Sequence, residues 1–534
     1  MTKRSLAGIA GIVAIATLIS KLFGLVRQQA IAAAFAVGPV ADAYGLSYVI
    51  PGFLLVLLGG INGPFHSAIV SVVAKRKRED IAPLVETITT LVGLGLVVLT
   101  LLIVVFADPI IGLLGRGFSE TSLGLESRAI AVVQLRIMAP MALFAGLIGI
   151  GFGTLNAADQ YWLPSISPLF SSVTVVAGLG LLALTVGDQI VSAEYAMLGG
   201  IILAAGTLAG AVLQWLVQVP ALLNAGLGRL RLRFNIHDSG VRDVLKVLGP
   251  ATFSSGMMQI NVYTDLFFAA FIPGTLAALG YANLLIQTPL GIISNVILVP
   301  FLPIFSRLAD PLHWHELKQR IRQSLLLTAL TMLPLSALFV TLALPMVRVI
   351  YERGAFDEEA TAIVTSVLIA YGVGMFVYLG RDVLVRVFYA LGDGDTPFRI
   401  SVVNIFLNAL LDYILINLLG APGLVLATVG VNLVSMVAML VLLDRKINGL
   451  PWLDWARPVA LLLLASVAAG AAAWGARLGL ERILGTQGFF VNLLILCGAG
   501  AVGLGIFGGC AIALRIPEAT LLIKRIKAKL GRSS

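Results

Sequence analysis

The chain has 534 residues, of which 59% are hydrophobic and only 12% are charged. A water-soluble domain of this size cannot bury so much apolar surface, so the composition excludes a soluble fold and predicts a polytopic membrane protein. Because a backbone in lipid must satisfy its own hydrogen bonds, and because the apolar runs are continuous rather than alternating, we expect an all-α protein and not a β-barrel.

Apolar runs of about twenty residues or more predict about fourteen transmembrane helices. The first six are expected near residues 6–36, 42–73, 82–107, 127–155, 162–186 and 193–221. The next eight are expected near residues 244–272, 276–306, 324–350, 360–391, 399–419, 421–443, 456–477 and 488–514. Lys21 and Arg27 interrupt the first run before any cleavage site, so we interpret it as a retained helix and not as a signal peptide.

The longest polar connection, from Asn224 to Asp238, is expected to separate two lobes. A weak repeat supports this division, because Asp42-Ala-Tyr to Pro51 recurs loosely from Tyr281 to Pro289. Parallel repeats of six helices are typical of alternating-access transporters. The predicted parts are an N-terminal lobe at 1–223, a cytoplasmic amphipathic linker at 224–243, a C-terminal lobe at 244–443, helices 13 and 14 at 444–515, and a basic cytoplasmic tail at 516–534.

The net charge of +9 does not indicate nucleic-acid binding, because the basic residues lie in short loops between apolar runs and there determine topology. They alternate from loop to loop, which predicts that both termini are cytoplasmic. The tail is either an amphipathic segment on an anionic membrane surface or a solvated topogenic segment. The basic clusters are Lys3–Arg4, Lys75–Arg78, Arg229–Arg233, Lys318–Arg322, Arg445–Lys446 and Lys524–Arg532.

Four oxygen-bearing side chains are expected at one depth in the membrane. Asn408 and Asp412 share a helix face, and Asp412 is about 12 Å below the outer surface at 1.5 Å per residue. Thr428 and Asp265 lie about 10 Å below the same surface. Such hard ligands suit a small cation, either sodium or a proton. The alternative is that Asn408 and Thr428 only join helices and that the aspartates face water.

Lys21, Arg27 and Asp42 form a second group, near the start of the chain. Charges at bilayer depth usually face a water-filled cavity or a partner. Cations that line such a cavity suit an anionic head group, here a diphosphate. The alternatives are that Lys21 pairs with Asp42, or that a cation extends to the interface.

Several motifs resemble the MurJ (MviN) family of lipid II flippases, within the multidrug/oligosaccharidyl-lipid/polysaccharide exporter superfamily. They are S-K-L-F-G-L-V-R ending at Arg27, A-D-A-Y around Asp42, and V-R-V-F-Y-A-L-G-D-G-D-T-P from Val385 to Pro397. The resemblance implies a flippase, not an enzyme, that moves lipid II from the inner to the outer leaflet of the bacterial cytoplasmic membrane for peptidoglycan synthesis. Its implied partners are the anionic lipid-linked precursor, membrane lipids and cell-wall synthesis proteins. It also implies a sodium site at the positions matching Asp265, Asn408, Asp412 and Thr428.

The chain departs from the family pattern at several cationic positions. Lys21 stands where the family usually has arginine, which removes a bidentate donor. The second helix lacks a common arginine, Leu284 replaces another, and Gln287 replaces a frequent acidic residue. A less cationic cavity keeps two other hypotheses open: flipping of another lipid-linked oligosaccharide, and cation-coupled multidrug export. A membrane scaffold with a decayed transport site is a third.

Two further groups are interpreted as structural. Asp395 and Thr396, before Pro397, are expected to cap the next helix. Arg381 and Asp382 are expected to form an ion pair. The two cysteines, Cys497 and Cys510, both lie in the last apolar run and predict neither a disulfide framework nor a metal site.

Overall fold

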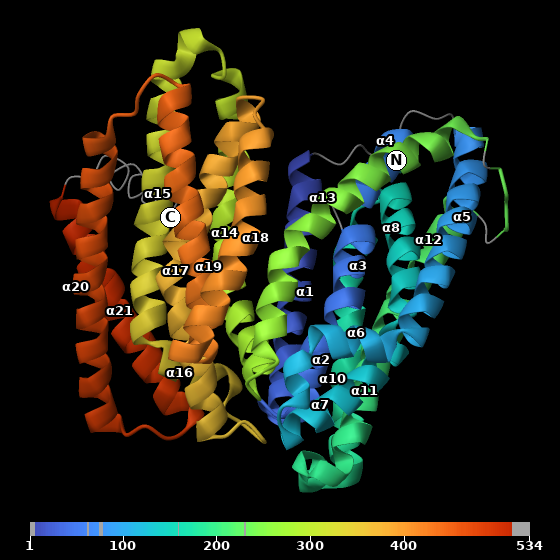
Figure 1. Ribbon diagram of the computed structural model, residues 1–534, viewed down its shortest axis with the longest axis horizontal. Coiled ribbons are helices and arrows are strands. Elements are labelled where there is room, and N and C mark those ends of the chain that lie inside the picture. Colours follow the sequence, from blue (N-terminus) through green and yellow to red (C-terminus); the bar gives the residue numbers. More distant parts are fainter. Residues whose placement is uncertain are drawn as a thin grey trace. The chain divides into compact units, whose positions relative to one another are not determined.

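The computed structural model describes residues 6–60, 64–73, 78–158, 160–228, 231–235 and 237–514 (Figure 1). Every regular element in these ranges is a helix, which confirms the all-α class. The predicted basic tail at 516–534 and parts of the predicted linker at 224–243 lie outside the described residues.

Packing divides the chain into two compact units, each described by itself. Unit 1 is Met1–Ala277 with Arg353–Phe356, and unit 2 is Ala278–Glu352 with Asp357–Ser534. The helix that was expected to open the C-terminal lobe packs with unit 1, against α4, α5 and α6. The lobe boundaries at 223 and 244 depend on the internal repeat and remain a prediction.

The helices of unit 1 cover the predicted apolar runs, but several runs, such as 127–155 and 193–221, are divided into two or more helices. They are α1 (Leu6–Phe35), α2 (Pro39–Ser47), α3 (Val49–Gly59), α4 (Pro64–Val73), α5 (Arg78–Val105), α6 (Ala107–Leu114), α7 (Ser122–Met138), α8 (Met141–Ala157), α9 (Trp162–Ile166), α10 (Pro168–Val186), α11 (Ala193–Leu216), α12 (Gln218–Asn224) and α13 (Ser239–Ala269). Short 3-10 turns follow α6 and α10.

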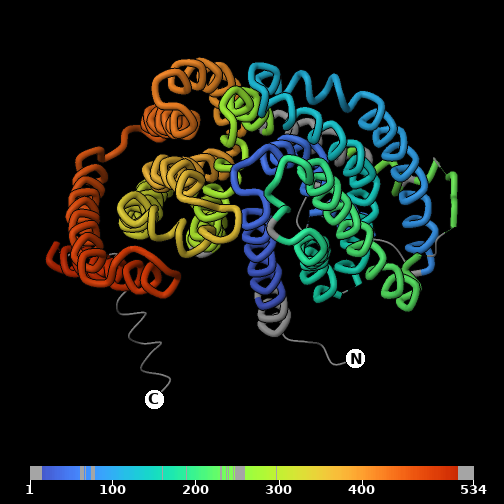
Figure 2. Tube along the Cα trace, turned by 90° about the horizontal axis from the view of Figure 1, so that it is seen from below, coloured from blue at the N-terminus to red at the C-terminus, as the bar shows by residue number. Residues whose placement is uncertain are grey.

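Unit 2 contains most of α14 and all later helices. Figure 2 shows many of them end-on, with α20 and α21 packed side by side at one edge. The helices are α14 (Thr275–Arg307), α15 (Trp314–Thr341), α16 (Ala343–Tyr351), α17 (Glu358–Ala390), α18 (Asp395–Leu419), α19 (Ala421–Lys446), α20 (Trp452–Leu484) and α21 (Phe489–Ala513).

Ten helices of the described chain are long and apolar enough to cross a membrane, or twelve when each of two bent pairs is taken as one span. The chain is therefore a multi-pass membrane protein. Two more helices, α1 and α13, have 30 and 31 residues. That length reaches about 45 Å at 1.5 Å per residue, enough for a bilayer. The total of fourteen spans stays a prediction that requires both to cross.

The single helix expected over 42–73 is replaced by three segments, α2, α3 and α4. The axis bends by 41° between α2 and α3, and α3 ends at Gly59 before an extended Gly60. The first break places Pro51 in the first turn of α3, where its missing N–H removes no helical hydrogen bond. Pro140 likewise precedes α8 at a 40° bend from α7.

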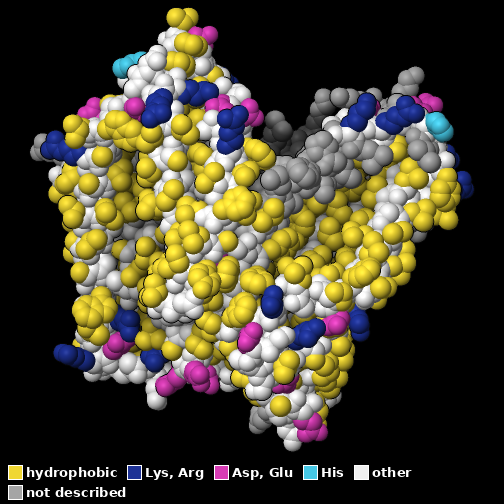
Figure 3. All heavy atoms as spheres, in the orientation of Figure 1, with side chains coloured by type: hydrophobic (Ala, Val, Ile, Leu, Met, Phe, Trp, Pro, Cys, Tyr) yellow, Lys and Arg dark blue, Asp and Glu magenta, His cyan; other side chains and the backbone are white. Residues whose placement is uncertain are grey.

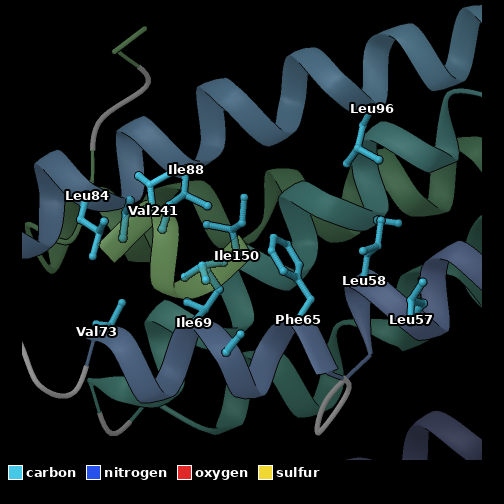
Figure 4. Close-up of a cluster of buried hydrophobic side chains, with 14 residues drawn as sticks. Leu57, Leu58, Phe65, Ile69, Val73, Leu84, Ile88, Leu96, Ile150 and Val241 are labelled. Carbon is cyan, nitrogen blue, oxygen red and sulfur yellow. The ribbon is translucent and has the colours of Figure 1, made fainter. Parts of the chain in front are cut away.

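The core of unit 1 combines large apolar side chains with a closely packed glycine helix. Phe65 and Ile69 of α4 pack with Leu84 and Ile88 of α5, as Figure 4 shows. On α8, a Cβ on Gly149 would collide with the backbone carbonyl oxygen of Leu58. Small residues of this kind let helix backbones approach closely in membranes, where no hydrophobic force drives helices together.

Part of the predicted linker is attached to α5. Arg233 Nε pairs with Glu86 Oε2 at 2.8 Å, and the Arg233 N–H donates to Thr90 Oγ1 at 3.1 Å. The Glu86 side chain is only 4% exposed, whereas that of Arg233 is 46% exposed. The arginine therefore supplies the countercharge of a buried carboxylate.

We predict that Gly149→Ala lowers the free energy of unfolding by about 1–3 kcal/mol, because the new methyl group must displace backbone. The control is Gly180→Ala on α10, where nothing lies within 4 Å of the new Cβ. Thermal unfolding of the purified protein in detergent compares the two. Equal melting temperatures for both variants would contradict the close packing.

Arg233→Gln is expected to destabilise the protein by about 1–3 kcal/mol, because it leaves the Glu86 carboxylate buried without its partner. Glu86→Gln leaves only a half-exposed arginine and is expected to cost less. The same unfolding measurement compares the two variants. If Glu86→Gln lowers the free energy of unfolding more than Arg233→Gln does, Arg233 is not the countercharge of a buried Glu86 carboxylate.

Candidate functional site

The middle of helix α18 carries three polar residues on its buried face. Its buried residues are Pro397, Asn404, Asn408 and Asp412. The last three are four residues apart and fall within about 80° around the helix. Large apolar side chains occupy the exposed surface; Phe406, for example, is 73% exposed. This arrangement is the reverse of that on a water-soluble helix. It suits a helix whose outer face contacts lipid and whose inner face contacts polar groups.

The amide and the carboxylate at the centre of this stripe contact each other. Asn408 Nδ2 donates to Asp412 Oδ2 at 2.7 Å, and both side chains are buried. The predicted shared face of Asn408 and Asp412 is thus confirmed. A buried carboxylate of this kind favours binding of a cation.

The helix α19 returns antiparallel to α18 after a tight turn and packs against it. Gly420 has φ +66°, which favours glycine, and a Cβ on Gly423 would collide with the Leu415 carbonyl oxygen. Asp412 lies eight residues before Gly420 and Thr428 lies eight residues after it, so they are at equal depth.

Two asparagines belong to the same polar region, although the sequence analysis does not single them out. Asn432 lies as far after Gly420 as Asn408 lies before it, and its Nδ2 donates to the Thr428 carbonyl oxygen at 2.7 Å. Asn404 is buried one turn beyond Asn408. The sequence signal that could have identified Asn404 is its four-residue spacing from Asn408. For Asn432 the signal is that it lies as far from Gly420 as Asn408 does.

The fourth predicted ligand, Asp265, lies on α13 in unit 1 and is half-buried. Only three of the four residues are therefore placed with respect to one another. Among the described residues, no group of three His, Cys, Asp or Glu side chains could hold a metal ion. The donors on α18 and α19 are instead carboxylate, amide and hydroxyl oxygens, and these fit a hard monovalent cation better than zinc or iron.

Asp42, the third member of the second predicted group, lies on α2, whereas Lys21 and Arg27 lie on α1. Asp42 on α2 is 2% exposed, and its two carboxylate oxygens accept from the N–H groups of Gly274 and Ala277, the latter at 2.9 Å. Asp42 thereby caps the first turn of α14, which belongs to unit 1. This contact gives Asp42 a structural role, and its predicted contact with a head group stays a prediction.

Lys21 and Arg27 both lie on α1 but on different faces. Six residues separate them, which places them about 120° apart around the helix. Lys21 is exposed, whereas Arg27 is half-buried and interacts electrostatically with Tyr44. The Nε of Arg27 is buried and has no hydrogen-bond acceptor among the described residues. Of the two cations, Arg27 is the better placed to bind an anion.

The run from Val385 to Pro397 ends in a cap made by a different residue from those expected. Asp393, and not Asp395, accepts from the N–H and the hydroxyl of Thr396, at 3.0 and 2.8 Å. It also pairs with Lys446 at 2.8 Å. Partial burial raises the pKa of Asp393, but the bonds from Lys446 and Thr396 outweigh this effect and lower the pKa to about 2.

The predicted pair of Arg381 and Asp382 on α17 is confirmed, at 3.7 Å. Arg381 Nε also donates to the buried Ser435 hydroxyl of α19 at 3.3 Å. These contacts join α17 to α19 within unit 2 and indicate a structural role.

Comparison with solved structures shows the fold. A lipid II flippase MurJ in an inward closed conformation superposes with a TM-score of 0.74 at 22% identity, covering 94% of this chain and 99% of that chain. An inward-facing multidrug resistance MATE family transporter of the MOP superfamily has a TM-score of 0.64 at 16% identity, with 82% and 98% covered.

Comparison of sequences gives closer relatives. A "Probable lipid II flippase MurJ" from Synechocystis is 57% identical over 532 residues, which cover 99% of each chain. A "Lipid II flippase MurJ" from Burkholderia cenocepacia is 28% identical over 471 residues, which cover 86% of this chain and 88% of the relative. The family model described as lipid II flippase MurJ matches residues 31–494. The chain therefore belongs to the MurJ family, a family of membrane transporters and not of enzymes.

Proposed function

We propose that this chain flips lipid II, the undecaprenyl-diphosphate-linked peptidoglycan precursor, from the inner to the outer leaflet of the bacterial cytoplasmic membrane. The observation that carries the proposal is the 57% identity to the Synechocystis relative over nearly the whole of both chains. The proposal includes the predicted orientation, with both termini cytoplasmic, because the loops rich in lysine and arginine alternate along the chain.

The head group is proposed to bind at Arg27. A guanidinium in a membrane span needs an anion, and the diphosphate supplies two phosphates for charge-assisted hydrogen bonds. The buried Nε of Arg27 supports this role, since no acceptor among the described residues satisfies it. Lys21 is exposed on another face of α1 and would contact a different part of the substrate. Asp42 is left out of the proposed site because it caps α14.

Transport is proposed to proceed by alternating access, in which a hydrophilic cavity opens first to the cytoplasm and then to the periplasm while the lipid tail stays in the bilayer. A sodium ion held by Asn408, Asp412 and Thr428, with Asp265 as a fourth ligand, would link this change to the ion gradient or the membrane potential. One unit charge that crosses 100 mV gains about 2.3 kcal/mol, enough to bias such a switch.

The flipping proposal predicts that Arg27→Gln strongly reduces lipid II in the outer leaflet. Cells that lack their own flippase would express either the wild-type chain or the variant. A membrane-impermeant enzyme that cleaves the diphosphate would report how much lipid II is accessible from outside. The matched control is Arg128→Gln, which removes an exposed pair with Asp108. Failure of the wild-type chain to restore accessibility in these cells would refute lipid II as the substrate.

The sodium proposal predicts that sodium raises the melting temperature of the purified protein relative to potassium at equal ionic strength. A ligand at a hundred times its dissociation constant stabilises by about 2.7 kcal/mol. Asp412→Asn is expected to abolish the difference between the two salts. The control, Asp382→Asn, removes a carboxylate that is paired with Arg381. In this variant the difference in melting temperature between sodium and potassium is expected to remain. A sodium effect that survives in Asp412→Asn would exclude this site.

A further inference from the structure

A cavity with several basic side chains lies within unit 2, and none of the proposed sodium or head-group residues lines it. It has a volume of about 710 Å³ and is formed by the first two turns of α15, the loop between α19 and α20, and the first two turns of α20. Figure 3 shows lysine and arginine side chains at this end of unit 2, as it also does at the opposite end. The apolar stretches of α15 and α20 begin just beyond it, so the cavity lies at head-group depth.

The cavity has an excess of positive charge. Lys318, Arg322 and Arg457 line it against one carboxylate, that of Asp454. Lys318 Nζ donates to the Asn448 carbonyl oxygen, and Arg322 Nε donates to the Asp454 carbonyl oxygen, each at 3.3 Å. Both bonds hold the loop. The Lys318 ammonium has three donors, so it can also donate to an anion.

An apolar slot of about 170 Å³ adjoins the basic cavity and shares Arg322 and Trp455 with it. Its other walls are apolar side chains of α15, α17, α19 and α20, among them Leu325, Phe376 and Met436. Trp455 lines both spaces, and Trp452 lines the slot. Tryptophan is enriched where head groups meet acyl chains, because its ring is apolar and its N–H is polar.

We propose that this cavity and slot form a binding site for an anionic glycerophospholipid of the surrounding leaflet. The phosphate and the acidic head group would lie among Lys318, Arg322 and Arg457, since basic pockets between transmembrane helices bind anionic head groups. One acyl chain would enter the slot, and the other would follow the exposed apolar surface of α20, where Leu464 is 66% exposed. The lipid would join the start of α20 to α15.

The choice of ligand follows from the two adjoining spaces together. A free phosphate would use the cations but not the apolar slot. A zwitterionic lipid would use the slot but would bring a cationic group into a site that already has an excess of positive charge. An acidic lipid uses both, and the site does not depend on which substrate is transported.

The test is the melting temperature of the full chain in detergent, titrated with short-chain phosphatidylglycerol or with phosphatidylcholine of the same chains. Phosphatidylglycerol is expected to stabilise the protein at lower concentration. The double variant Lys318→Gln/Arg457→Gln is expected to weaken this response about tenfold or more, the loss for one or two charge-assisted hydrogen bonds. The matched control is Arg320→Gln, on the same helix but outside the cavity, whose pair with Glu316 is exposed.

A second variant tests the slot without changing charge. Ala456→Phe fills the slot and is expected to weaken the phosphatidylglycerol response while gel filtration and unfolding without lipid stay as in wild type. The water-soluble glycerol phosphate is expected to stabilise little. The proposal is overturned if glycerol phosphate reproduces the full effect, if phosphatidylcholine acts equally well, or if both variants respond like wild type.

Discussion

The bilayer cannot form hydrogen bonds with a polypeptide, and this constraint determines where every polar group in the spans must lie. On α18, Asn404, Asn408 and Asp412 face inward and large apolar side chains face outward, the opposite of a soluble helix. The Asp42 carboxylate satisfies N–H groups at the start of α14, and Arg381 donates to a hydroxyl on α19. A polar group that remains in such a protein therefore has a partner, a cavity or a ligand.

Close packing is the second consequence of the same solvent. Lipid tails are as apolar as leucine, so helices associate through backbone approach and short polar contacts. Glycines on α8 and at the start of α19 allow this approach, and prolines at the two bends interrupt the spans where little hydrogen bonding is lost. The turn at Gly420 brings Asp412 and Thr428 to one depth, so a feature of packing also builds the proposed ion site.

The charged residues within or beside the spans have different roles. Asp42 and Asp393 accept hydrogen bonds from backbone N–H groups, while Arg27 and Asp412 are proposed to bind ions of opposite sign. At one end of unit 2, cations hold a loop and line a cavity at the same time.

Composition and the length of the apolar runs were sufficient to predict the all-α membrane class and nearly every helix, because each span must be long, apolar and hydrogen-bonded within itself. The four-residue spacing also predicted that Asn408 and Asp412 share a face. Only the tertiary structure decided that Asp42 is a helix cap, that Asp393 replaces Asp395 as the cap before α18, and that the 42–73 helix breaks twice. Those outcomes depend on contacts between residues that are far apart in the chain or on local bends, and periodicity along one helix carries no information about either.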